Sequence, residues 1–489
     1  MSTQSIPKPA APPSSLPSNP PANVVTGPSA RQWIILAIAV VVGLAIVSLP
    51  TPHGLSRIAQ LVLGITAFTA VLWASQVINN GIASILMMGL LMLAGVKVPL
   101  VLSGFGGGSF WVLLTVLFYG FAMKKTGLAE RISYYILSLF PGSYRGILTA
   151  FFVIGFVLAL GIPSMTVRTA IMVPVAWALV QSLGLEKRSR GSALIILTTV
   201  EMAVIPGVAF LYGSLSGPIV ANSFAAKHLP LTWLGYAQAI TFPTLLLCIM
   251  ILIVNPIVLR PEAPLAANPT FARDRLRSLG PFQRPELITG LVVLFSIVFW
   301  TTDSYHHLPS FLVGMIAVAV FAFSGILKDS EISTGVSWPL LLFIGGIFGL
   351  ANVIQEYKVT DWIAGYFVPV VNQLTSSIIL LTIVMAVAMY ALRFLDPSSF
   401  IAISVLFLSV VDLTNKAGIP PLILMAPIII ASVPFWMLYQ NFWLAMGDGL
   451  TGSEAFTPGQ RIRLANTYAL AVFVTLALSA GYWKLIGMI

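Results

Sequence analysis

Long apolar runs dominate this sequence, and several of them reach about 20 residues, the length of a helix that crosses a bilayer. Hydrophobic residues make up 58% of the chain and charged residues only 8%, against about 25% charged residues in soluble domains. The alternating apolar and polar pattern of a membrane β-barrel is absent. We therefore expect an all-α polytopic membrane protein, with about 11 transmembrane helices plus two re-entrant hairpins in an inverted repeat.

The composition limits which partners and cofactors this chain is expected to bind. The formal net charge is +10, but in a membrane protein Lys and Arg gather in cytoplasmic loops, so we expect a lipid bilayer around the chain and no nucleic acid. The single cysteine, Cys248, excludes disulfides and thiolate metal sites within the chain. No metal or cofactor is expected beyond Na⁺ or H⁺ as a coupling ion. Residues 1–30, rich in Pro, Ser and Ala, are expected to form a disordered N-terminal tail.

Two apolar segments are interrupted by residues that are costly in a membrane. Gly161 to Val175 contains two prolines, three hydroxyl residues and Arg168, and Leu392 to Ser404 contains Arg393, a proline and paired serines. A charge at membrane depth costs about 2.5–3.5 kcal/mol on insertion scales and usually marks a site. The bland alternative is a pair of Pro-kinked packing helices whose arginines reach the interface. Two interrupted segments at corresponding places in two halves favour a transporter's binding site.

The chain divides into two similar halves. Phe110 to Ala122 resembles Ser337 to Ala351, about 230 residues later, and a broken hairpin and a broken helix follow each segment. We expect the following division: residues 31–258 as a first repeat (TM1–TM6, with an inward-side hairpin at 145–183), 259–285 as a cytoplasmic loop, and 286–489 as a second repeat (TM7–TM11, with an outward-side hairpin at 375–412). The repeated unit of each half would hold five crossings, an odd number, which makes the halves inverted.

The distribution of Lys and Arg sets the expected orientation. Most basic residues fall on one side of the membrane when the N-terminus is placed in the cytoplasm and both hairpins re-enter. This arrangement puts the C-terminus outside, and the inner (plasma) membrane is the expected location.

A signature in the first half indicates a family. KKTGLAERI (Lys124 to Ile132) is followed some 30 residues later by PSMTVRTAIMVP (Pro163 to Pro174), and the chain from about residue 32 to its end resembles the divalent anion/sodium symporter family of the ion-transporter superfamily. The resemblance implies a scaffold domain with homodimer contacts and a transport domain with two hairpins and two unwound helices. It also implies import or exchange of di- and tricarboxylates, sometimes sulfate, generally coupled to sodium.

The chain departs from that family at both hairpin tips. The family's first motif reads Ser-Asn-Thr, and one dicarboxylate branch continues it as Ala-Arg; here the run is Ser164, Met165, Thr166, Val167 and Arg168. The second Ser-Asn-Thr motif is replaced by a run from Asp396 to Ser399. Sodium prefers hard oxygen ligands, and both Asn side chains are missing. Proton coupling or anion exchange is therefore favoured over sodium symport.

The expected substrate-binding residues lie at these two tips. Serine and threonine hydroxyls can donate to a carboxylate, the helix N-terminus after each tip adds backbone N–H groups, and an arginine can pair with a carboxylate through two hydrogen bonds. The alternatives are hydroxyls that only cap helices and an Arg168 that pairs internally with Asp396 or Glu201. The expected set is Ser164, Met165, Thr166, Arg168, Pro397, Ser398 and Ser399.

A second set of residues could couple transport to an ion. Glu201 lies in an apolar segment where an isolated carboxylate tends to be protonated, so it is either a proton-coupling group or a structural partner of Arg168 or Arg393. Freed carbonyls at helix breaks can also coordinate cations. The ion-coupling candidates are Glu201, Gly207, Gly213, Ser214, Asp396 and Asn441.

These features predict a secondary active transporter of small organic anions of the di- or tricarboxylate kind, working by an elevator-type alternating-access mechanism. One alternative is an oxyanion transporter or a cation/proton antiporter of the same superfamily. A less favoured alternative is an intramembrane enzyme that uses Arg168, Glu201 and Asp396. An enzyme needs a nucleophile within reach of a base, and the broken segments contain no His. We therefore expect no enzymatic activity.

Overall fold

The computed structural model describes residues 29–265, 270–359, 362, 374, 377–394 and 399–489. Every regular element in these ranges is a helix. Nine of the described helices are long and apolar enough to cross a membrane, or up to ten if one bent helix pair counts as a single span. The chain is thus a multi-pass, all-α membrane protein, as the sequence predicted. The apolar helices Asn80–Leu93 and Phe311–Phe323 are shorter than these.

In the first part of the chain, three helices each begin directly after a residue whose side chain caps the helix. Ser29, Ser56 and Asn79 each accept a hydrogen bond from a backbone N–H in the first turn of the helix that follows. A turn at Gly127, with φ of +79°, separates two helices that differ in direction by 64°. The helices are α1 (Ala30–Ser48), α2 (Arg57–Ser75), α3 (Asn80–Leu93), α4 (Val98–Val101), α5 (Ser103–Gly106), α6 (Gly108–Lys125) and α7 (Leu128–Ser138).

The next segment contains the first hairpin and the first broken helix. Gly and Pro residues between Ile205 and Pro218 interrupt the apolar run, as expected from the missing donor of proline and the freedom of glycine. The helices are α8 (Tyr144–Gly161), α9 (Met165–Ser182), α10 (Arg190–Val204), η1 (Ile205–Val208), α11 (Ser216–Ala226), α12 (Trp233–Val258) and α13 (Phe271–Ser278). We call residues 162–164 the first tip and residues 205–215 the first break.

The remaining helices repeat this order. They are α14 (Arg284–Thr301), α15 (Asp303–His306), α16 (Phe311–Phe323), α17 (Asp329–Ile332), α18 (Trp338–Glu356), α20 (Ile378–Arg393), α21 (Phe400–Lys416), α22 (Pro421–Ile430), η2 (Leu438–Gln440), α23 (Phe442–Leu450) and α24 (Pro458–Leu485). We call residues 394–399 the second tip and residues 431–441 the second break. Most of residues 359–371 lie outside the described ranges.

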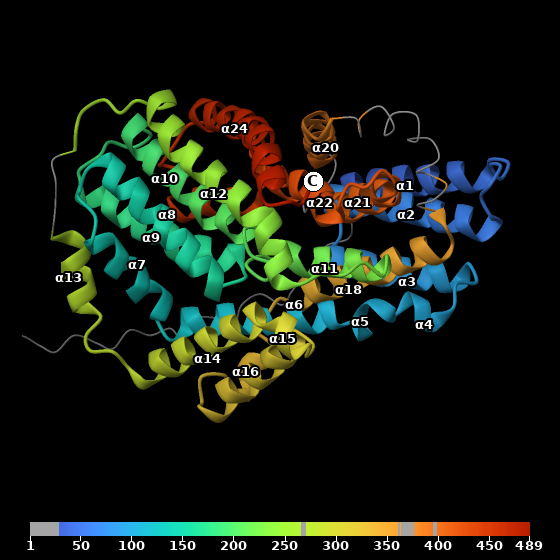
Figure 1. Cartoon of the computed structure of the whole chain (residues 1–489), viewed down its shortest axis with the longest axis horizontal. Coiled ribbons are helices and arrows are strands. Elements are labelled where there is room, and N and C mark those ends of the chain that lie inside the picture. The colour runs from blue at the N-terminus through green and yellow to red at the C-terminus, as the bar shows by residue number, and fades with distance from the viewer. Residues whose placement is uncertain (1–28, 266–269, 360–361, 363–373, 375–376, 395–398) are drawn as a thin grey trace, which may run out of the picture.

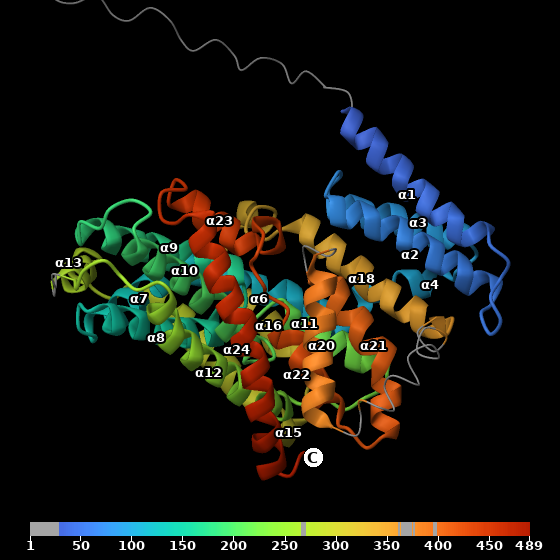
Figure 2. The same ribbon diagram turned by 90° about the horizontal axis from the view of Figure 1, so that it is seen from above.

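The two halves pack against each other through matching partners. Helix α6 packs on α16 and α18 packs on α3, while α9 packs on α23 and α11 packs on α21. The long helices α12 and α24 contact each other (Figures 1 and 2). Such reciprocal contacts are what an inverted repeat produces, although the boundaries 31–258, 259–285 and 286–489, and the sides on which the hairpins enter, stay predictions.

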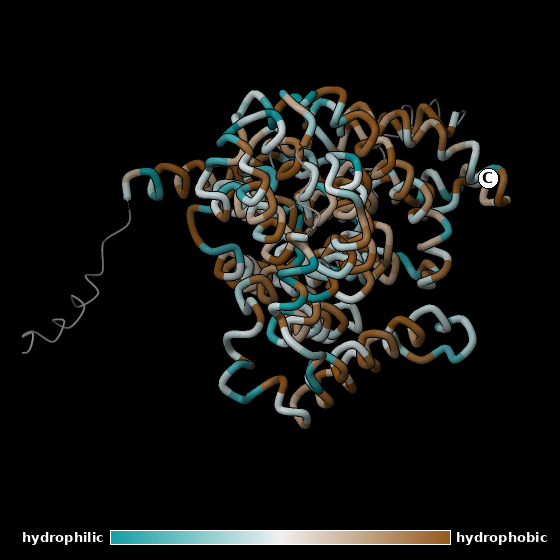
Figure 3. The backbone as a smooth tube through the Cα atoms, turned by 90° about the vertical axis from the view of Figure 1, so that its left-hand side faces the viewer, coloured by the Kyte–Doolittle hydropathy of each residue, from teal (hydrophilic) through white to brown (hydrophobic). Residues whose placement is uncertain are grey.

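The outer surface is suited to lipid. Figure 3 shows hydrophobic residues along most of the helices, with hydrophilic residues gathered mainly at the turns between them. Large apolar side chains such as Trp33, Phe295 and Phe323 are exposed on α1, α14 and α16. An apolar surface of this extent is unusual for a protein in water and matches the hydrocarbon of a bilayer.

Candidate functional site

The first tip presents two hydroxyl groups whose protons remain available. Ser164 is the N-cap of α9, where its Oγ accepts a hydrogen bond from the N–H of Val167 at 3.3 Å. Thr166 is the second residue of α9, and its hydroxyl accepts a hydrogen bond from the indole N–H of Trp443 at 3.2 Å. Each hydroxyl acts here as an acceptor, and neither donates to another group among the described residues. Capping therefore leaves both hydroxyls free to donate to a ligand.

Arg168 is directed at the first break and is fully buried. Helix α10 ends at Val204, so its last carbonyls have no partner within the helix. The guanidinium of Arg168 donates to the carbonyl oxygens of Ala203 at 2.6 Å and Val204 at 3.4 Å. It also donates to the carbonyl of Ile162 in the first tip at 2.5 Å and to that of Gly213 in the break at 2.7 Å. Arg168 thus joins the tip to the broken helix.

Two glycines make room for this arrangement. A Cβ atom on Gly207 would lie 2.0 Å from Nη2 of Arg168, and one on Gly213 would lie 2.7 Å from the carbonyl oxygen of Gly207. Only glycine allows the backbone to approach this closely. These two ion-coupling candidates therefore surround the guanidinium of Arg168. The neighbouring Ser214 is buried, and its hydroxyl has no hydrogen-bond partner within the described chain.

The second hairpin repeats this chemistry with a different arginine. Arg393, the last residue of α20, donates from Nε to the carbonyl of Ser432 at 2.8 Å and from Nη2 to the carbonyl of Gln440. Asn441 caps α23, because its Oδ1 accepts from the N–H of Leu444 at 3.0 Å. Each break is therefore held by an arginine from the hairpin of its own half.

Of the second tip, the structure describes only Phe394 and Ser399. Asp396, Pro397 and Ser398 lie outside the described residues. Ser399 is buried and has φ of +66°, a conformation that non-glycine residues rarely adopt and that often occurs at functional sites. The next residue, Phe400, packs its ring 6.3 Å from that of Phe343 on α18.

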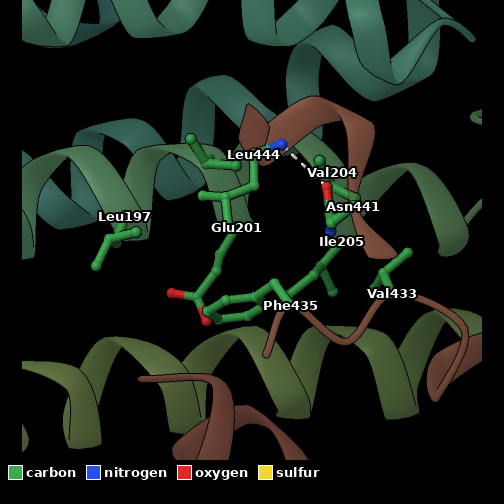
Figure 4. A pocket seen from close by; sticks show the side chains of 9 residues that line it. Leu197, Glu201, Val204, Ile205, Val433, Phe435, Asn441 and Leu444 are labelled. Carbon is green, nitrogen blue, oxygen red and sulfur yellow. Dashed lines mark hydrogen bonds between the residues drawn. The ribbon is translucent and has the colours of Figure 1, made fainter. Parts of the chain in front are cut away.

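Glu201 lies apart from the first tip, in an apolar environment between α10 and the second break. Its Oε2 accepts from Nδ2 of Asn255 at 2.6 Å, and the same amide donates to Thr198 at 3.0 Å. Its Oε1 has no hydrogen-bond partner in the described ranges. Figure 4 shows the carboxylate beside the ring of Phe435, pointing away from Asn441. The pocket that it borders is almost entirely apolar.

Among the ion pairs of the described residues, none joins Glu201 to a basic side chain. The internal pair of Arg168 with Glu201, which the sequence left open, is therefore absent from the described part of the chain. The hydrogen-bond partner of Glu201 is instead Asn255 of α12.

A pocket of about 550 Å³ opens at the first tip. Its size suits a small molecule. One wall carries Ser164 and Thr166, and another is formed by the end of α6 and the segment that leads into α18. The lining residues are Leu117, Phe121, Lys124, Lys125, Ser164, Thr166, Val167, Leu215, Thr334, Gly335, Val336, Ser337 and Leu340. Hydroxyl donors and ammonium groups line this pocket and no acidic side chain does, so it suits a small anion.

Two more residues lie beside the hydroxyl groups: Met165 separates Ser164 from Thr166 in the chain, and Trp443 contacts Thr166. Met165 is buried, with 1% of its surface exposed, and a thioether offers no hard oxygen to an alkali cation. Trp443, which contacts Thr166, was not expected from the sequence. Trp443 lies shortly after the second break in the sequence, but Thr166 lies 277 residues away from it. Only the packing of α23 on α9 brings the two residues together.

Comparisons with known proteins identify the relatives of this chain. The family model described as "Sodium:sulfate symporter transmembrane region" matches residues 30–489. The "Putative malate transporter YflS" of Bacillus subtilis is 27% identical over 68% of this chain and 72% of its own length. "Dicarboxylate transporter 1, chloroplastic" of Spinacia oleracea is 25% identical over 79% of this chain and 69% of its own length. The crystal structure of the YdaH transporter of Alcanivorax borkumensis, described as having an unusual topology, shares the fold with a TM-score of 0.54 at 13% identity, over 79% of this chain and 88% of that one.

Proposed function

The chain belongs to the sodium:sulfate symporter family of membrane transporters, and we propose that it is a secondary active transporter of small organic anions of the dicarboxylate kind. The observation that carries this proposal is the pocket at the first tip, where hydroxyl donors and an ammonium group face a space of small-molecule size. The names of the malate and dicarboxylate transporters among its relatives support the same substrate class.

In this proposal one carboxylate of the substrate binds at the first tip. The hydroxyl protons of Ser164 and Thr166 point to it, and the N-terminus of α9 adds backbone N–H groups and the positive end of its helix dipole. Ser398 and Ser399 would serve the same purpose at the second tip. Arg168 acts as a positioning residue, because the carbonyls of the first break occupy its guanidinium.

Transport then takes place by an elevator-type movement. The two walls of the pocket come from different groups of helices: α9 carries the tip, and α6 and α18 form the other wall. We infer that the hairpins and broken helices move together against α6 and α18 and carry the anion with them. A homodimer formed through the helices that stay in place would anchor this movement.

Coupling to protons, or exchange of one anion for another, is favoured over sodium symport. Met165 replaces an amide side chain that would offer oxygen to sodium, and the buried Glu201 offers a group that can take up a proton.

One alternative substrate has specific support. The description of the matching family names sulfate, and an inorganic oxyanion would fit the same hydroxyl and ammonium groups.

The test of this proposal is uptake into proteoliposomes that contain the purified protein. We expect saturable uptake of a labelled four-carbon dicarboxylate, with the same compound recovered unchanged inside. Protein-free liposomes are the control. Uptake of sulfate with no uptake of any di- or tricarboxylate would contradict the proposal and favour the oxyanion alternative.

The tip hydroxyls give a specific prediction. We expect Ser164→Ala, Thr166→Ala and Ser398→Ala each to weaken dicarboxylate binding by about 0.5–1.5 kcal/mol, the usual value of one neutral hydrogen bond. The proteins should remain folded, because a lost cap costs only about 1 kcal/mol. Binding is measured by calorimetry and folding by thermal unfolding. If all three variants bind the anion as tightly as the wild type, the hydroxyls are only caps.

A further inference from the structure

Two adjacent lysines at the end of α6 line the pocket, but they differ in their partners. The ammonium of Lys125 donates to both carboxylate oxygens of Glu331, at 2.6 and 2.5 Å, so a carboxylate neutralises its charge. The side chain of Lys124 is exposed and takes part in no hydrogen bond or ion pair within the described residues. The uncompensated positive charge of the pocket therefore comes from Lys124.

The position of Lys124 relative to the tip is the second observation. Ser164 and Thr166 lie on the wall formed by the first tip and α9, whereas Lys124 belongs to α6, which lines the same pocket. No acidic residue lines the pocket, so an anion there meets no repelling side chain. A lysine ammonium acts as a point charge that tolerates several carboxylate geometries, which suits a group that receives a ligand rather than fixing it.

We propose that Lys124 binds the second carboxylate of a dianionic substrate during its capture and release, while the first carboxylate rests on the first tip. This inference rests on the proposed function and adds a residue that selects dianions over monoanions. Because the lysine stands on the wall that stays in place, its contact is made only when the tip faces this pocket. Lys124 therefore governs capture and release on this side of the membrane, and the contact breaks when the hairpins move away.

The test compares transport kinetics of Lys124→Gln with those of a matched control. We expect Lys124→Gln to raise the KM for a dicarboxylate about five- to tenfold, with little change in the maximal rate, because a hydrogen bond to a charged group is lost at a partly exposed site. The KM for a monocarboxylate analogue should not change. The dicarboxylate KM of the wild type should rise with ionic strength, and that dependence should weaken in the variant.

The matched control is the double variant Lys187→Gln with Glu454→Gln, which removes a lysine outside the pocket together with its neutralising partner. This control should keep the wild-type KM, and Lys124→Arg should keep it as well. Lys124→Gln is expected to unfold at the wild-type temperature, since Lys124 has no partner to lose. A dicarboxylate KM equal to that of the wild type in Lys124→Gln, or an equal rise in the double variant, would overturn the inference. A wild-type protein that transports no dicarboxylate would instead overturn the proposed function.

Discussion

Replacing Arg168 by methionine should abolish transport and lower the unfolding temperature more than any substitution at the pocket. The change leaves four carbonyl oxygens without their donor at the first break and the first tip. A buried polar group left unsatisfied costs about 1–3 kcal/mol, so the total loss is comparable with the whole stability of a typical domain, about 5–15 kcal/mol. Thermal unfolding in detergent and uptake in proteoliposomes measure the two effects.

Two further variants separate the structural role of Arg168 from binding. Arg168→Lys keeps the charge, but one ammonium cannot reach all four carbonyls, so we expect an intermediate loss of stability. Gly207→Ala should be destabilising with the arginine still present, because its Cβ would lie 2.0 Å from Nη2 of Arg168. An Arg168→Met protein that unfolds at the wild-type temperature and fails only in anion binding would show that Arg168 is a ligand, as the sequence also allowed.

Glu201 should make transport depend on protons. We expect an inward proton gradient without sodium to accelerate anion uptake, and Glu201→Gln to remove that acceleration while leaving exchange of internal for external anion. The reason is that Glu201 is buried with one carboxylate oxygen unpartnered among the described residues and with an amide, not a cation, as its neighbour. Burying an unpaired charge is costly, so taking up a proton lets this side chain move within the protein in neutral form.

The matched control for Glu201 is a glutamate far from the broken helices. Glu454 is partly exposed and pairs with Lys187 at 2.7 Å, so Glu454→Gln should leave the proton dependence unchanged. The rates are compared under an imposed proton gradient without sodium and under an imposed sodium gradient at fixed pH. Uptake that follows sodium alone, and that survives both Glu201→Gln and Asp396→Asn, would contradict proton coupling.

The sequence alone could predict the all-helical fold, because the apolar runs and their interruptions are local features. Pro206 and Gly207 follow the end of α10 at Val204, and Pro434 lies in the break after α22. The number of crossings was harder to predict. The hairpin arms α8 and α9 are each 18 residues long and as apolar as crossing helices, so length and composition do not separate the two kinds.

The contacts of the site depended on residues far apart in the chain and could not be predicted in the same way. The sequence placed Arg168 at the first tip, but its acceptors are carbonyls up to 45 residues away whose direction follows from how the break folds. Lys124 belonged to the motif that indicated the family. Its place in the pocket follows from the packing of α9 beside α6, which no local pattern shows.

The central claim is that the anion binds in the pocket at the first tip, and thiol protection tests it most directly. The sequence contains one cysteine, Cys248, which is fully buried, so a single introduced cysteine can be labelled selectively. Val167 lines the pocket and is partly exposed, which makes Val167→Cys the variant of choice. In a Val167→Cys protein that still transports, a dicarboxylate should slow alkylation over the concentration range that saturates uptake. Alkylation at an unchanged rate in saturating dicarboxylate would place the binding site elsewhere.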